Sequence, residues 1–169
     1  VMNIQTFINN YKEAFGDAAE LPIGFWYSDK PVAETGKING CFFKGMKEVR
    51  EGHPIGLNAE AIGCGGGKFD TGFTEMPERV PNFVSLKEKY KKTPEMVIEF
   101  IRELGVPRTD KQYLNFVRID GLDSFEEVEG LIFFATPDVL AGLATWAFYD
   151  NNSPDAMISM FGSGCSTVI

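Results

Sequence analysis

The sequence has no hydrophobic run long enough to cross a membrane and no cluster of consecutive basic residues. No stretch approaches the ~18 consecutive apolar residues that a transmembrane helix needs. Acidic residues number 24 against 16 basic ones, which gives a net charge of −8. This balance opposes binding to phosphate backbones and to anionic lipids. We therefore expect neither nucleic acid nor a membrane as a partner.

Histidine is almost absent, and acidic residues show no catalytic spacing. His53 is the only histidine, so a Cys–His or Ser–His–Asp arrangement would have to use it. Nothing in the sequence places His53 near a cysteine, and its position between Gly52 and Pro54 is typical of an exposed turn. The carboxylates of the central region are scattered over predicted surfaces: Glu48, Glu51, Asp70 and Glu75.

Cysteine is also scarce. The chain has three cysteines, Cys41, Cys64 and Cys165, an odd number that does not suggest a disulfide framework. The first residues contain neither the basic segment nor the continuous apolar run of an export signal. We therefore expect a cytoplasmic protein whose cysteines are free thiols, metal ligands or redox groups.

The patterns that are present are those of a globular α+β domain. The 169 residues, 44% of them hydrophobic, suit a single domain with a full core. Apolar residues recur at helical spacing over residues 3–15, 40–51, 94–104 and 136–149. Short apolar or alternating runs predict strands at residues 21–27, 54–60, 113–119, 131–135 and 156–161. The prediction is a mixed β-sheet of about five strands with helices packed on it.

Two of the predicted helices have residues of special interest on their apolar sides. In the helix over 40–51, Cys41 lies on the apolar side, so packing in the core is the simpler interpretation of this residue. In the helix over 136–149, the side chains expected to face inward are those of Val139, Leu140, Leu143, Ala144 and Ala147.

The most informative feature is Cys64, which follows a predicted strand and lies among the glycines of Gly63-Cys64-Gly65-Gly66-Gly67. Glycines let the backbone adopt positive φ and approach a ligand closely. If a helix begins after this turn, its free N–H groups and its dipole would stabilise a thiolate. The simpler interpretation is a tight turn in which a small cysteine fills a gap, and both interpretations stay open.

The three cysteines could act together. The helix with Cys41 leads through one short strand to the Cys64 loop, so the two sulfur atoms could converge as catalytic thiols. Cys165 follows a second glycine turn, and Cys41, Cys64 and Cys165 could together hold an iron–sulfur cluster or a metal ion. Against a metal site, the sequence has no Cys-x-x-Cys pair.

A different class of function uses the same loop without thiol chemistry. In this alternative, Gly65, Gly66 and Gly67 present backbone N–H groups to a small anionic ligand, and the protein is a non-enzymatic binding module. The loop lacks the Walker spacing, so it is not a nucleotide-binding P-loop. A third interpretation is a scaffold that meets another protein through exposed aromatic side chains.

The order of these segments resembles a known family. The segments that carry the resemblance are Tyr11–Gly16, Leu21–Trp26, the Cys41 helix, the Asn58–Gly66 motif and Gly72-Phe73. This order is similar to domain-of-unknown-function family 169, the uncharacterised bacterial and archaeal ArCR family. The resemblance implies that Cys41, Cys64 and Cys165 occupy positions typical of the family, and it implies no established activity. Members continue past a glycine turn such as the one at 162–164, so we expect that residues 1–169 are one domain lacking a C-terminal segment.

Overall fold

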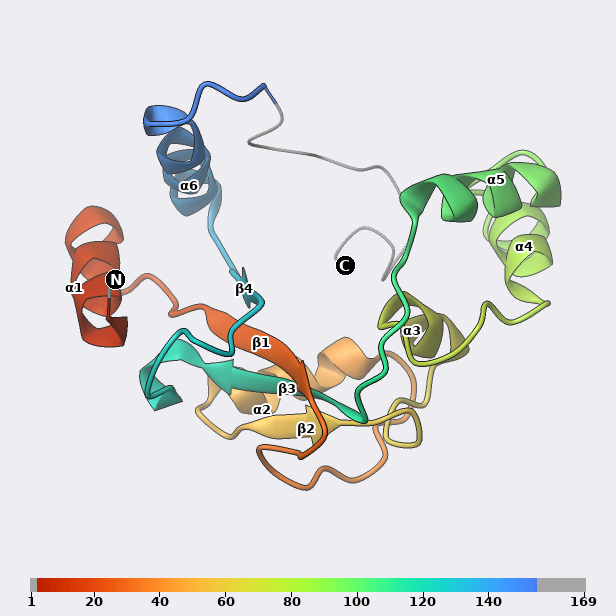
Figure 1. The fold of residues 1–169 in the computed structure, drawn as a ribbon. Coiled ribbons are helices and arrows are strands. Elements are labelled where there is room, and N and C mark those ends of the chain that lie inside the picture. Colours follow the sequence, from red (N-terminus) through yellow and green to blue (C-terminus); the bar gives the residue numbers. More distant parts are fainter. Residues whose placement is uncertain (1–2, 155–169) are drawn as a thin grey trace.

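The centre of the fold is a four-stranded antiparallel sheet (Figure 1). The computed structural model describes residues 3–154. The strands have the order β2-β3-β1-β4, and their bounds are β1 Ile23–Ser28, β2 Ile55–Leu57, β3 Tyr113–Arg118 and β4 Gly130–Ile132. The central pair β1–β3 has the longest register, from Ile23 opposite Arg118 to Ser28 opposite Tyr113.

Six α-helices surround this sheet within the described residues. They are α1 Ile4–Phe15, α2 Met46–Arg50, α3 Gly65–Asp70, α4 Val80–Asn82, α5 Pro94–Leu104 and α6 Pro137–Tyr149. Shorter turns are the 3₁₀-helices η1 Phe42–Gly45 and η3 Ile119–Gly121, and the π-helical turn η2 Phe83–Lys87. Helices α1 and α6 lie at one end of the molecule, and α3, α4 and α5 lie at the other (Figure 1). No helix of residues 3–154 is both long and apolar enough to cross a membrane.

Capping residues explain why α1 and α5 begin and end where the sequence predicts. The side chain of Asn3 accepts a hydrogen bond from the backbone N–H of Thr6, and Gly16 ends α1 with φ of 84°. The side chain of Thr93 caps α5 in the same way, and Gly105 ends it in the left-handed conformation. The predicted helix over 94–104 is confirmed without a shift of either end.

The main core lies between the sheet and the segment formed by η1 and α2. Phe42, Met46 and Val49 recur at helical spacing and are buried. They pack with buried side chains of the strands: Ile23, Ile55, Leu57, Leu114 and Phe116. A smaller cluster beneath α1 consists of Ile4, Ile8 and Ile119.

The predicted α+β class is confirmed, but the predicted mixed sheet of five strands is wrong for the described residues. All strand pairs there are antiparallel, and parallel pairing is limited to the single bridges Glu34–Gly56 and Ile38–Ile62. Apolar alternation identifies strands but not their directions, which depend on how long connections return to the sheet. The predicted strand over 156–161 lies outside the described residues.

The inward side predicted for the last helix is also wrong in part. Only Val139 of α6 is buried, and the side chain of Leu140 is 58% exposed. The helix packs at the edge of the fold on Phe15, whose ring lies 5.1 Å from that of Trp146. Because α6 is apolar on nearly all sides, its residue spacing does not identify which side faces the protein.

Candidate functional site

Cys64 is the N-cap of helix α3. Its backbone is extended, with φ of −90° and ψ of 125°, and its carbonyl oxygen accepts the first helical hydrogen bond from the N–H of Lys68 at 3.0 Å. A helix does begin directly after this cysteine, which meets the condition set for stabilising a thiolate at this position. The side chain is partly exposed, and Sγ lies 3.8 Å from the position that a Cβ atom on Gly66 would occupy. The sulfur therefore lies beside the first turn of α3.

The loop that contains Cys64 packs side by side with the loop that contains Cys41. A parallel bridge joins Ile38 to Ile62. The N–H of Ile38 donates to the carbonyl of Ala61 at 2.8 Å, and the N–H of Gly63 donates to the carbonyl of Ile38 at 3.0 Å. The two loops therefore lie side by side in the backbone, and the convergence of the two sulfur atoms stays a prediction.

Cys41 itself is not in the core. It is exposed and is the N-cap of η1, so the interpretation of this residue as core packing is wrong. The helical segment begins one residue after Cys41, at Phe42, and the apolar side predicted for the whole segment therefore excludes the cysteine. Both Cys41 and Cys64 are free cysteines.

Packing accounts for two of the glycines around Cys64. A Cβ atom on Gly63 would lie 2.4 Å from the carbonyl oxygen of Ile38, and one on Gly67 would lie 3.0 Å from the ring of Phe42. Gly63 requires glycine because the backbone of the Cys41 loop lies so close, whereas a side chain at position 67 would need the Phe42 ring to shift. Gly66 is different, since a Cβ atom there would meet only the sulfur of Cys64.

The far end of α3 is held to the rest of the fold by side-chain interactions. The hydroxyl of Tyr27 donates to the carbonyl of Thr71 at 2.8 Å, which joins β1 to the end of the helix. The Thr71 hydroxyl donates to the carbonyl of Gly67 at 2.7 Å. The guanidinium of Arg108 lies over the ring of Phe69 at 4.4 Å and donates to the Phe69 carbonyl at 3.3 Å.

Two ionisable groups at this end of α3 have shifted pKa values. Burial raises the pKa of Asp70 to about 6, and the opposing attraction of Arg108 is smaller. Burial also raises the pKa of Tyr27 to about 12, with a further contribution from Glu129. No sequence pattern marks Asp70, because the partial burial of its carboxyl group depends on the fold.

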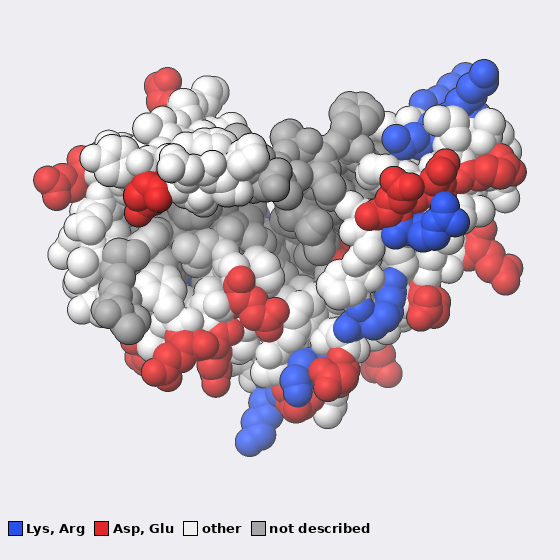
Figure 2. Space-filling view, turned by 45° about the horizontal axis from the view of Figure 1, so that its top comes forward, with Lys and Arg blue, Asp and Glu red and all other residues white. Residues whose placement is uncertain are grey.

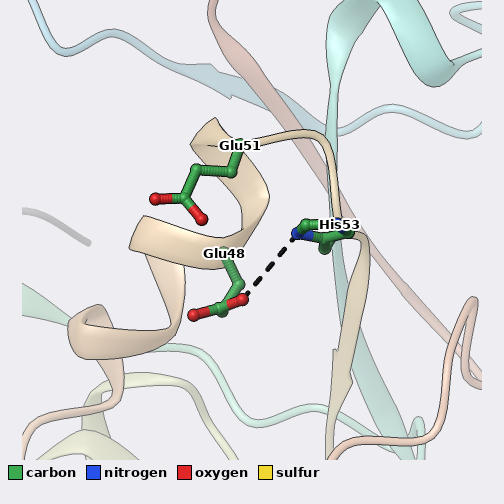
Figure 3. Close-up of side chains that lie close together, drawn as sticks. All are labelled: Glu48, Glu51 and His53. Carbon is green, nitrogen blue, oxygen red and sulfur yellow. Dashed lines mark ion pairs between the residues drawn. The ribbon is translucent and has the colours of Figure 1, made fainter.

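Within residues 3–154, one group of three side chains has the spacing of metal ligands, and it contains no cysteine. Glu48, Glu51 and His53 lie at the end of α2 with ligand atoms within 4.8 Å of one another, and all three are exposed (Figure 3). His53 Nδ1 lies 3.8 Å from a carboxylate oxygen of Glu48. Exposed groups of this kind form surface ion pairs without a metal.

Two of the three predicted cysteine ligands lie in the described part of the chain. Cys41 and Cys64 belong to adjacent loops, but in the described part of the chain no group of three candidate metal ligands includes either of them. Cys165 lies outside the described residues. The metal or cluster site at Cys41, Cys64 and Cys165 therefore stays a prediction.

Comparison with known proteins gives one finding. The model of the family DUF169, described as uncharacterised ArCR, matches residues 15–169. Neither the curated proteins nor the solved structures include a match to this chain. The match covers nearly the whole sequence, including both cysteine loops and α3, so the chain belongs to the uncharacterised ArCR family, DUF169.

Proposed function

We propose that Cys64 is a reactive thiol and that Cys41 is a second thiol of the same site. The observation that carries this proposal is the position of Cys64 at the N-cap of α3, with its sulfur beside the first helical turn. The first N–H groups of a helix have no intrahelical partner, and together with the helix dipole they stabilise a neighbouring negative charge. A thiolate in this position can donate an electron pair to an electrophilic substrate atom.

The contact between the two loops supports the inclusion of Cys41. The bridge between Ile38 and Ile62 brings together the segments that immediately precede the two cysteines. Each cysteine is then the N-cap of a helical segment, η1 for Cys41 and α3 for Cys64. Free thiols of this kind suit a reducing compartment such as the cytoplasm.

The test is the rate of alkylation of each cysteine, measured by mass spectrometry after brief exposure to iodoacetamide at neutral pH. We expect Cys64 to be labelled faster than Cys41, although Cys64 is the less exposed of the two, because the thiolate is the reactive form of a cysteine. Gly66→Ala is the matched variant, because its methyl group would contact only the Cys64 sulfur and any change of rate should be confined to Cys64. Labelling of Cys64 that is no faster than that of Cys41 would refute a reactive thiol.

A metal or iron–sulfur centre is the form of this proposal that also uses Cys165. Its support is that two of the three cysteines already belong to adjacent loops. Protein purified without oxygen should then contain iron and sulfide, or another metal, and absorb visible light. The variants Cys41→Ser, Cys64→Ser and Cys165→Ser should each lose the metal. A colourless, metal-free protein would exclude this form and leave the thiol proposal standing.

The second candidate function is a small-molecule binding module for an anionic ligand at Gly65, Gly66 and Gly67. It is favoured by Arg79, whose Nη2 lies 3.7 Å from the position of a Cβ atom on Gly65. A guanidinium beside the glycines would supply the positive charge that attracts a phosphate or a carboxylate.

Thermal unfolding tests this candidate with a panel of phosphates and carboxylates. A ligand that binds the folded state raises the melting temperature, and Arg79→Ala should abolish the increase. No increase with any compound of the panel, and no small molecule retained in native mass spectrometry, would exclude the binding module.

A further inference from the structure

The arm formed by α4, η2 and α5 ends in a tip whose apolar side chains are uncovered. The arm lies at the end of the molecule away from α1 and α6 (Figure 1). Its inner side packs through the buried residues Pro81, Ser85 and Val97. At the tip, however, the side chain of Leu86 is 65% exposed, that of Tyr90 is 49% exposed and that of Phe83 is 43% exposed. A group of exposed apolar side chains, unlike a single one, indicates an interaction surface.

Lysines surround these apolar side chains. The segment 87–92 contains Lys87, Lys89, Lys91 and Lys92 with one glutamate, Glu88, which gives it a net charge of +3. The whole chain has a net charge of −8, so the remainder has a net charge of −11. On the side of the molecule where the arm lies, Figure 2 shows blue side chains gathered at the outer end. The sign of the charge at the tip is therefore opposite to that of the rest of the protein.

The lysine side chains at the tip lie along apolar surface. Lys87 Nζ is 5.3 Å from the centre of the Phe83 ring, and Lys91 Nζ is 4.5 Å from that of Phe100. In both pairs the ammonium group lies over the face of an aromatic ring, which attracts a cation. Lys89 turns the chain at the end of the arm with φ of 61°. The tip thus presents aliphatic and aromatic groups with ammonium groups around them.

We propose that this tip, residues 83–92, docks on the surface of an anionic lipid bilayer. A bilayer interface takes up leucine, tyrosine and phenylalanine side chains without needing a matching pocket, and anionic headgroups attract lysines beside them. An uncharged aliphatic residue such as Leu86 gains little from a nucleic acid, whose bases stack on aromatic or guanidinium planes. For the tip alone, this proposal replaces the expectation from net charge that no membrane is bound.

The charges next to the tip determine how it can approach a membrane. Glu95 and Glu99 follow on α5 and are exposed. An anionic surface would repel these carboxylates, so only an approach with the tip pointing at the bilayer brings the lysines near the headgroups. The acidic remainder of the chain then faces away from the bilayer.

Flotation with lipid vesicles tests the proposal with the full chain. We expect a several-fold larger bound fraction on phosphatidylcholine vesicles that contain phosphatidylglycerol than on phosphatidylcholine alone. At ~1 M salt, where the Debye length is ~3 Å, this preference should disappear. The double variant Lys89→Glu/Lys92→Glu should lose the preference, and Leu86→Ser/Tyr90→Ser should lower the bound fraction at low salt.

The matched control is Lys30→Glu/Lys37→Glu, which makes the same change of charge at exposed lysines elsewhere. It should bind vesicles almost as the wild type does. Circular dichroism and thermal unfolding establish that each variant is folded, as expected for exposed positions. Equal binding to both kinds of vesicle, or equal losses in the control and the tip variants, would overturn the proposal. So would binding to DNA or to an acidic protein through the tip without binding to vesicles.

Discussion

Replacement of Gly63 by alanine tests the contact between the two cysteine loops. A Cβ atom at this position would lie 2.4 Å from the carbonyl oxygen of Ile38 and 3.3 Å from the Cα atom of Asn39. Backbone atoms cannot move aside as the end of a side chain can, so the loops must separate. Overpacking costs about 1–3 kcal/mol, and weakening the hydrogen bond from Gly63 to Ile38 costs about 0.5–1.5 kcal/mol more. We therefore expect the free energy of unfolding to fall by roughly 2–4 kcal/mol.

Gly66→Ala, three residues further along, is the control. A Cβ atom there meets nothing nearer than the Cys64 sulfur at 3.8 Å, and the position is within α3. Alanine in place of glycine in a helix stabilises by about 0.5–1 kcal/mol. Equilibrium unfolding in urea, followed by tryptophan fluorescence, should thus show shifts of opposite sign for the two variants. If the free energy of unfolding of Gly63→Ala lies within about 0.5 kcal/mol of the wild-type value, as for a tolerated surface substitution, the two loops are not packed as described.

Three further predictions concern Asp70, Asn115 and Gly72. Asp70 has a higher pKa in the folded state, about 6, than the usual 3.8, so the folded state binds more protons and the free energy of unfolding falls as the pH rises between these values. Asp70→Asn should remove this fall and be more stable than the wild type at pH 7 by ~1 kcal/mol after allowance for solvent screening. If the pH profile of urea unfolding is the same in the variant, the Asp70 carboxyl is not desolvated. Asn115 is buried, and its side-chain oxygen accepts a hydrogen bond from the N–H of Val32 at 2.8 Å. Asn115→Ala should lower the free energy of unfolding by about 1–3 kcal/mol, because it leaves that N–H without its partner. A smaller loss in urea unfolding would contradict a structural role of this hydrogen bond. Gly72 has φ of 77°, and a Cβ atom there would lie 2.6 Å from the carbonyl oxygen of Pro107; Gly72→Ala should lower the melting temperature clearly, whereas a neutral effect would mean that this contact is loose.

The sequence predicts best those features that depend on neighbouring residues. The ends of α5 follow from Thr93 and Gly105, and the start of α1 follows from Asn3. In these places the backbone hydrogen bonds are local, so composition and spacing contain the necessary information.

The features that the sequence does not predict depend on contacts between distant segments. Gly63 must be glycine because of the carbonyl of Ile38, which belongs to a different loop. The raised pKa of Asp70 requires the fold that buries its carboxyl group. The exposure of Leu140 on α6 is not predicted, because a helix that is apolar on nearly all sides has no periodic signal of direction.

The most direct test of the central claim compares Cys64 with Cys41 in folded and in urea-unfolded protein. Cys41 is the more exposed of the two in the folded state, so accessibility alone would make it the faster to react. If the N-terminus of α3 activates Cys64, the ratio of the alkylation rate of Cys64 to that of Cys41 should be higher in the folded protein than in the unfolded chain. A ratio that falls on folding, as partial burial alone would cause, would contradict a reactive thiol at Cys64.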